Sequence, residues 1–172
     1  TLPSRFMLVG AMNPCRCGWY GHPSGRCRCT KQQVEKYVEK ISGPMLDRMD
    51  LHVNVPSVEF EAMRRREKAE SSADVKVRVN KARERQKERL AGTSVACNAQ
   101  MSPAMVGEFC ALDASGEKLL RGAFDRLGLT ARSHDRLLRV ARTIADLDGS
   151  EKIEAQHLAE AIQYRNTDIL RG

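Results

Sequence analysis

The sequence contains few aromatic residues and no long hydrophobic run. One Trp, three Tyr and four Phe occur among its 172 residues, so stacking of nucleic-acid bases on aromatic rings is not expected as the main mode of binding. No segment reaches the roughly 18 consecutive apolar residues that a membrane-spanning helix needs, and no basic and then apolar leader opens the chain. These absences predict a globular protein of the cytoplasm.

A phosphate-binding loop is missing as well. The motif G-x-x-x-x-G-K-[S/T] occurs nowhere in the sequence, and no apolar run ends in the acidic pair that would hold Mg²⁺. We therefore expect this chain by itself neither to bind ATP well nor to hydrolyse it.

The net charge of +7 is concentrated in one part of the chain. Residues 60–92 carry 11 basic and 6 acidic side chains, whereas residues 93–172 carry 10 basic and 11 acidic ones. A local basic excess is typical of a surface that binds a polyanion. Two interpretations stay open: contact with DNA phosphates, or a solvated helix face on which Glu84 and Glu88 pair with basic neighbours.

Two apolar segments predict β-strands. Residues 6–9, Phe-Met-Leu-Val, form a continuous apolar run followed by small residues, as in a buried central strand of a parallel sheet. Residues 51–55 alternate between apolar and polar side chains and predict a second strand. Because two strands cannot form a stable parallel sheet, we expect the N-terminal half of an α/β domain to be missing.

Hydrophobic periodicity predicts helices over most of the remaining chain. Thr30 followed by Gln33 has the form of a capping box before the first of them. On the longest, Val75, Val79, Ala82 and Leu90 are expected to form the buried side. The expected helices cover residues 31–41, 45–49, 73–90, a segment starting at 102–103, 115–127, 133–147 and 155–164.

Four cysteines occur as two close pairs in the glycine-rich segment 15–29. Cys15-x-Cys17 and Cys27-x-Cys29 can surround one Zn²⁺ with four thiolates in tetrahedral geometry, and a closed set of four ligands indicates a structural site. The alternatives are a redox or disulfide arrangement, free thiols, or another metal.

Three further residues bear on the metal site. His22 lies inside the loop and could replace one cysteine, although an exposed or hydrogen-bonding role is favoured. Cys97 and Cys110 are distant and isolated, so they are interpreted as ordinary small buried residues.

Several segments together resemble one protein family. They are LVGAMNP at 8–14, GPMLDRMDLHVNVP at 43–56, CNAQMSP at 97–103 and HLAEAIQYR at 157–165, with the cysteine-rich insertion. They are similar to the magnesium-chelatase-like AAA+ ATPases of the bacterial ComM (YifB) type. The resemblance implies an AAA+ core followed by a helical lid, a homo-hexameric ring that hydrolyses ATP with Mg²⁺, and action on branched or single-stranded DNA.

The resemblance also implies roles for single residues. Asn13 resembles the sensor-1 residue that orients the attacking water, and its competing interpretation is a turn-forming Asn before Pro14. Arg48 resembles the arginine finger that reaches the nucleotide of a neighbouring subunit. Its competing interpretation is a salt bridge to Asp47 or Asp50.

A third arginine is expected to sense the nucleotide from the lid. Arg132, placed just before a helix starting near Ser133, resembles the sensor-2 residue. Because Arg136 and Arg139 share its helix face, the assignment could move by a turn, and Arg136 is the second candidate.

The expected fold is therefore an α/β remnant of an AAA+ core with an incomplete sheet, followed by an all-α helical lid. The core part would cover residues 1–56 with the zinc-binding insertion at 15–29, the linker 57–72, and the lid 73–172. We expect the chain to function as part of an ATPase motor. The alternative is a self-contained zinc-binding module for nucleic acid, without a role in ATP hydrolysis.

Overall fold

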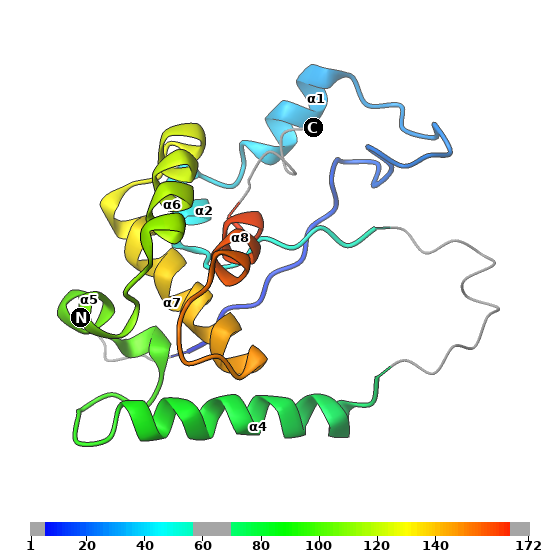
Figure 1. Cartoon of the computed structure of the whole chain (residues 1–172). Coiled ribbons are helices and arrows are strands. Elements are labelled where there is room, and N and C mark those ends of the chain that lie inside the picture. The colour runs from blue at the N-terminus through cyan, green and yellow to red at the C-terminus, as the bar shows by residue number, and fades with distance from the viewer. Residues whose placement is uncertain (1–5, 57–69, 166–172) are drawn as a thin grey trace. The chain divides into compact units, whose positions relative to one another are not determined.

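The computed structural model describes residues 6–56 and 70–165, without the side chain of Arg132 (Figure 1). The linker expected over residues 57–72 lies almost entirely outside this part and stays a prediction. The chain divides into two compact units, one formed by residues 1–46 and 167–172 and the other by residues 47–166.

Neither predicted β-strand is present, which corrects the expected incomplete sheet. Residues 6–9 and 51–55 have no regular secondary structure, and the described part of the chain contains helices only. Met7 is 88% exposed and Val55 is 81% exposed. The backbone N–H and C=O groups of a strand need hydrogen-bond partners on a neighbouring strand. Neither segment has such a neighbouring strand among the described residues.

The unit that contains residues 6–46 consists of the cysteine-rich loop, helix α1 (Lys31–Val38) and the start of helix α2 (Gly43–Arg48). The predicted capping box is confirmed: the backbone N–H of Thr30 donates to Gln33 Oε1 at 3.0 Å, and that of Gln33 donates to Thr30 Oγ1 at 3.3 Å. Helix α1 ends before the expected residue 41, and Val34 is its buried side chain.

The second unit contains the helices expected after residue 72, and their predicted ends are within about two residues of those observed. Helix α7 packs against α4, α5, α8 and the short helix η1, and α6 packs against α8. The elements are α4 (Ser72–Arg89), η1 (Asn98–Gln100), α5 (Pro103–Phe109), α6 (Ala114–Leu127), α7 (Ala131–Asp148) and α8 (Ala155–Gln163).

The helices of this unit share one hydrophobic core. Leu137 and Leu158, from α7 and α8, are 0% exposed, and burying a Leu side chain stabilises a fold by about 1.5–3 kcal/mol. The core residues are Leu90, Met101, Val106, Cys110, Leu120, Ala123, Leu137, Leu138, Ala141, Ala145, Ile153, Leu158, Ala161 and Ile162.

A buried polar network crosses this core. The carboxylate of Asp146 is 0% exposed. It accepts hydrogen bonds from Arg142 Nε at 3.1 Å, from Asn98 Nδ2 at 2.8 Å and from both terminal nitrogens of Arg89. Arg142 also donates to the carbonyls of residues 150 and 151. Two guanidinium groups share one carboxylate in this network, and hydrogen bonds to carbonyls and to Asn98 satisfy the remaining donors that join α4, η1 and α7.

Helix α4 differs from its predicted amphipathic pattern. Ala82 and Leu90 are buried as expected, but Val75 is 37% exposed and Val79 is 42% exposed. The residues of its N-terminal half, 72–81, are all exposed, since the described part of the unit covers only the C-terminal half. The apolar face therefore extends beyond the surface it packs on.

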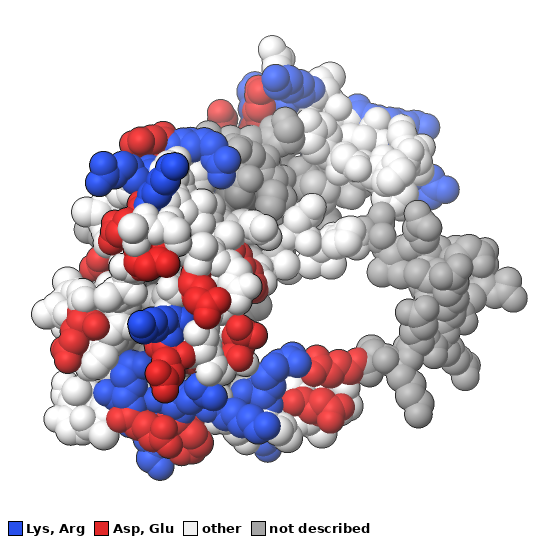
Figure 2. Space-filling model, viewed as in Figure 1, with Lys and Arg blue, Asp and Glu red and all other residues white. Residues whose placement is uncertain are grey.

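The basic side chains of α4 have several different partners. Arg78 forms a forked ion pair with Glu70 at 2.6 and 3.0 Å, and Arg85 donates to the carbonyl of Gly149 at 2.8 Å. Lys87 Nζ lies 3.9 Å from Glu84 Oε2, which is one of the pairings that the solvated-face interpretation predicts, whereas Glu88 forms no ion pair with another described residue. Figure 2 shows acidic and basic side chains interleaved along this helix.

No helix of the described residues is long and apolar enough to cross a bilayer.

Candidate functional site

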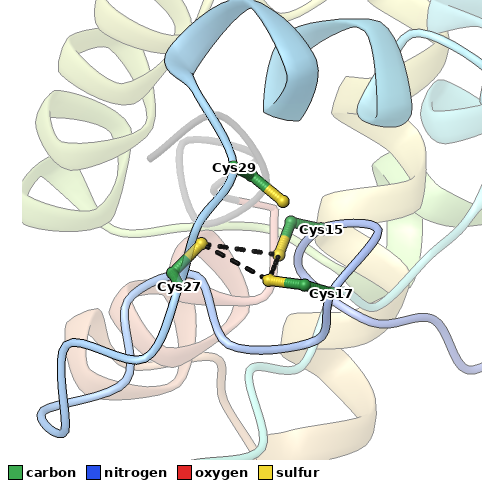
Figure 3. A group of neighbouring side chains, drawn as sticks. All are labelled: Cys15, Cys17, Cys27 and Cys29. Carbon is green, nitrogen blue, oxygen red and sulfur yellow. Dashed lines mark hydrogen bonds between the residues drawn. The ribbon is translucent and has the colours of Figure 1, made fainter.

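Four cysteine side chains converge within residues 15–29 (Figure 3). The Sγ atom of Cys15 lies 3.3 Å from that of Cys17 and 3.8 Å from that of Cys27, and the Sγ atoms of Cys17 and Cys27 are 3.6 Å apart. With Cys29 included, the four sulfurs lie within 4.8 Å of one another. Sulfurs bound at about 2.3 Å around a tetrahedral ion are about 3.8 Å apart, so one metal ion fits the cluster.

The geometry bears on the alternatives to a metal site. All four cysteines are free thiols, and the closest sulfurs, 3.3 Å apart, are well beyond the roughly 2 Å of a disulfide. His22 does not belong to the cluster: its Nδ1 atom accepts the backbone N–H of Ser24 at 3.0 Å, and its ring packs edge-on against Trp19. The cysteines alone therefore form the candidate ligand set.

The loop that carries the cysteines is built from tight turns. The backbone N–H of Gly18 donates to the carbonyl of Cys15 at 3.0 Å, and that of Gly25 donates to the carbonyl of His22 at 3.2 Å. Gly18 has φ +82°, a conformation that glycine adopts without steric cost. Within residues 15–29 only Cys15 is buried, so the loop has almost no hydrophobic core of its own. A bound ion would supply the missing cross-link.

The thiols of the cluster differ in acidity. The backbone N–H of Trp19 stabilises the thiolate of Cys17 and lowers its pKa to about 6. The backbone N–H of Cys29 also favours the thiolate of Cys27, but burial and the neighbouring sulfurs outweigh it and raise the pKa of Cys27 to about 11. Sulfurs this close cannot all ionise together unless a cation neutralises them, which suits a divalent metal.

Asn13 lies next to this loop. Its side chain is exposed, and a Cβ atom added at Gly18 would lie 3.8 Å from its Cγ atom. Asn13 was expected at the end of a buried strand, and residues 6–13 are irregular instead. The structure thus places Asn13 beside the first turn of the cysteine loop, and its sensor-1 role stays a prediction.

Arg48 is the last residue of α2, and its side chain is exposed. Arg136, from α7, donates through Nη1 to the backbone carbonyl of Arg48 and lies 3.3 Å from Oδ1 of Asp50. The second candidate for sensor-2 therefore contacts the segment around Arg48. Asp50 was considered as a partner of Arg48, and its carboxylate pairs with Arg136.

Arg165 contacts the same segment as Arg136. Its Nη2 atom lies 3.0 Å from Oδ1 of Asp47, and its terminal nitrogens donate to the carbonyls of Asp47 and Met49. The side chain of Arg165 is only 5% exposed. Sequence reasoning missed this residue, because nothing in a local pattern indicates a partner more than a hundred positions away.

Arg132 lies in the first turn of α7 rather than before it. The helix begins at Ala131, because the side chain of Thr130 accepts the backbone N–H of Ser133 at 3.2 Å and caps it there. Of its side chain nothing is described, and the sensor-2 role stays a prediction.

A cavity of about 380 Å³ lies beside Arg136 and Arg139 in the unit 47–166. Its walls include the apolar side chains of Leu51, Val140 and Ile144. The acidic residues Asp50 and Glu160 also line it. A phosphate group needs several cations or backbone N–H groups that no carboxylate offsets, so this lining does not suit one.

Two descriptions of known protein families match parts of this chain. Residues 69–165 match the family described as magnesium chelatase, subunit ChlI C-terminal, and residues 1–63 match that described as magnesium chelatase, subunit ChlI.

Relatives match along nearly the whole chain. The uncharacterised protein YifB of Escherichia coli K12 is 43% identical over 171 residues, which are 99% of this chain and 33% of that protein. The competence protein ComM of Haemophilus influenzae is 40% identical over 164 residues, 95% of this chain and 31% of that protein. The chain thus spans about a third of the length of these relatives. It belongs to the magnesium chelatase-like family and is of the ComM/YifB type.

Proposed function

We propose that this chain is part of an AAA+ ATPase and contributes polar residues to an ATP site. The observation that carries the proposal is the family match of both parts of the chain, with an exposed arginine at the end of α2. The phosphate-binding loop and the ligands of Mg²⁺ would lie in a further part of the natural protein. The chain alone is then inactive towards ATP.

Arg48 acts in this proposal as an arginine finger. A guanidinium group is positively charged and can fork onto two oxygens of a phosphoryl group. The exposed side chain of Arg48 can reach a neighbouring subunit, which requires an assembled ring, and a homo-hexamer is the assembly we propose.

Asn13 and Arg132 also act on nucleotide in this proposal, as sensor-1 and sensor-2. An amide can donate to a phosphate oxygen and accept from a water molecule, which suits Asn13 to orienting the attacking water. Of the two candidates for sensor-2 we favour Arg132, because Arg136 already pairs with Asp50 and with the carbonyl of Arg48.

The metal of the cysteine cluster is proposed to be a structural Zn²⁺ held by Cys15, Cys17, Cys27 and Cys29. The ion would neutralise the thiolates and cross-link a loop that has almost no core. All four positions of a tetrahedron are then filled by protein ligands, which leaves none for a substrate.

DNA is the proposed substrate of the motor. Lys76, Lys81 and Arg83 on α4 are exposed, and none forms an ion pair with any residue the structure describes. They are free to contact phosphates, whereas Arg78 and Arg89 have acidic partners.

ATP turnover of the whole natural protein tests the proposal. Replacing the finger, Arg48→Ala, is expected to lower kcat by about 10³-fold, since such arginines contribute about 10³–10⁵ to phosphoryl transfer. Arg121→Ala, at an exposed position of α6, is the matched control and should turn over ATP at the original rate. Unchanged turnover for Arg48→Ala in an assembled ring would rule out this role.

A further inference from the structure

Three consecutive backbone carbonyls at the end of α2 accept hydrogen bonds from two distant arginines. Arg165 donates to the carbonyls of Asp47 and Met49, and Arg136 donates to the carbonyl of Arg48 between them. All five residues belong to the unit 47–166. The backbone on both sides of Arg48 is thus held by side chains from α7 and from the turn after α8.

The last carbonyls of a helix have no partner within the helix and carry its partial negative charge. A guanidinium group satisfies both needs, because it supplies several N–H donors and a positive charge. Two carboxylates strengthen the arrangement: Asp47 lies 3.0 Å from Arg165 and Asp50 lies 3.3 Å from Arg136. The two arginines therefore cap α2 in place of a local residue.

Burial makes the contacts of Arg165 hard to replace. Its side chain is 5% exposed, and the partners of its terminal nitrogens are Asp47 and Met49. A guanidinium removed from water is costly unless it is paired, so releasing residues 47–49 would leave a buried charge uncompensated. Beyond them, the backbone N–H of His52 donates to the carbonyl of Tyr164 at 2.8 Å, which fixes the other end of the segment.

We infer that Arg165 and Arg136 are positioning residues for Arg48. They hold the backbone from which its exposed side chain projects, so that the guanidinium reaches the same place in every turnover. The inference rests on the proposed role of Arg48 in ATP hydrolysis. Displacing a catalytic group by about 1 Å costs about 10²-fold in rate, so the two arginines matter without touching the nucleotide.

Two variants of the whole natural protein test the inference. Arg136→Gln removes the half-buried partner with little risk to folding, and Arg165→Ala removes the buried one. Both are expected to lower kcat by about 10²-fold, while KM for ATP changes much less, because neither residue binds nucleotide. Arg165→Lys keeps the positive charge but not the forked geometry of the guanidinium group. Its kcat is therefore expected to lie between that of Arg165→Ala and that of the unaltered protein.

Amide hydrogen exchange gives a readout that does not depend on ATP. Exchange of residues 47–52 should become faster in both variants and remain unchanged in Arg121→Gln, which alters an exposed arginine of α6. The inference would be overturned if folded Arg136→Gln and Arg165→Ala both kept the original kcat and the original exchange rates. If Arg48→Ala were inactive in the same assay, the proposed function would still stand. Full activity of Arg48→Ala would overturn the proposed function and, with it, this inference.

Discussion

The Nη2 atom of Arg165 lies 3.0 Å from the Oδ1 atom of Asp47, although 118 positions separate the two residues. Their contact joins the turn after α8 to the segment that carries Arg48. That segment consequently belongs to the compact unit of the helices and not to the unit that contains the cysteine loop. A residue proposed to act on a neighbouring nucleotide is thus anchored by the part of the chain that resembles a lid.

We predict that the cysteine cluster binds one metal ion. Protein purified without added metal should contain about one zinc per chain by elemental analysis, and Cys27→Ser should lose most of it, because three sulfurs leave the tetrahedron open. Removing the ion with a chelator should also expose Arg26, within the loop, to cleavage by trypsin, since zinc binding contributes on the order of 10 kcal/mol to such loops.

Cys97→Ser is the control for this experiment, because Cys97 is half-buried and lies outside the cluster. Its metal content should equal that of the unaltered chain. A zinc content near zero in the unaltered chain, with thiol titration that finds all four sulfurs in disulfides, would contradict a structural metal site.

We predict that Asp146 is essential for the stability of the helical unit. Asp146→Ala leaves Arg142 and Arg89 without their shared carboxylate, and breaking a buried ion pair costs about 3–5 kcal/mol. Urea unfolding followed by circular dichroism should show this loss as a lower midpoint. Asp125→Ala, at an exposed position of α6, should change stability by less than about 0.5 kcal/mol. Equal midpoints for both variants would show that the network does not stabilise the fold.

We predict that α4 contributes to DNA binding. Replacing Lys76, Lys81 and Arg83 together by Ala should weaken the affinity of the whole protein for single-stranded DNA. The slope of log K against log[salt] should become shallower by about 0.7 for each phosphate of the single strand that the variant no longer neutralises. Fluorescence anisotropy at several salt concentrations measures both quantities.

The matched control removes the same net charge elsewhere. Lys118, Arg121 and Lys152 are exposed positions outside α4, and their triple Ala variant should keep the original affinity and slope. If the two triple variants lose affinity equally, only the net charge attracts DNA, and α4 has no specific part in it.

Local patterns predicted the helices well, for reasons that the contacts explain. Thr30 caps α1 through Gln33, and Ser102 with Pro103 opens α5, as their sequence positions indicate. The spacing of Leu137, Ala141 and Ala145 on α7 corresponds to the buried face of that helix. Helix capping and amphipathic periodicity act over a few residues, so they can be identified without knowing the rest of the fold.

Patterns failed where the outcome depends on a distant partner. The residues at 6–9 and 51–55 look like strands, but strand formation depends on neighbouring strands that the described residues do not supply. Val75 and Val79 follow a helical stripe, yet nothing described packs on that end of α4. Arg142 and Asp146, four residues apart, could have been noticed as charges on an otherwise apolar helix face.

The sequence by itself determined the helices, the four clustered cysteines and the family, because capping, periodicity and ligand spacing are encoded within short segments. Only the tertiary structure decided which arginines contact the end of α2. Arg136 and Arg165 meet residues 47–50 through contacts that span 86 to 118 positions. Such contacts depend on how the helices pack, and packing is a property of the whole folded unit.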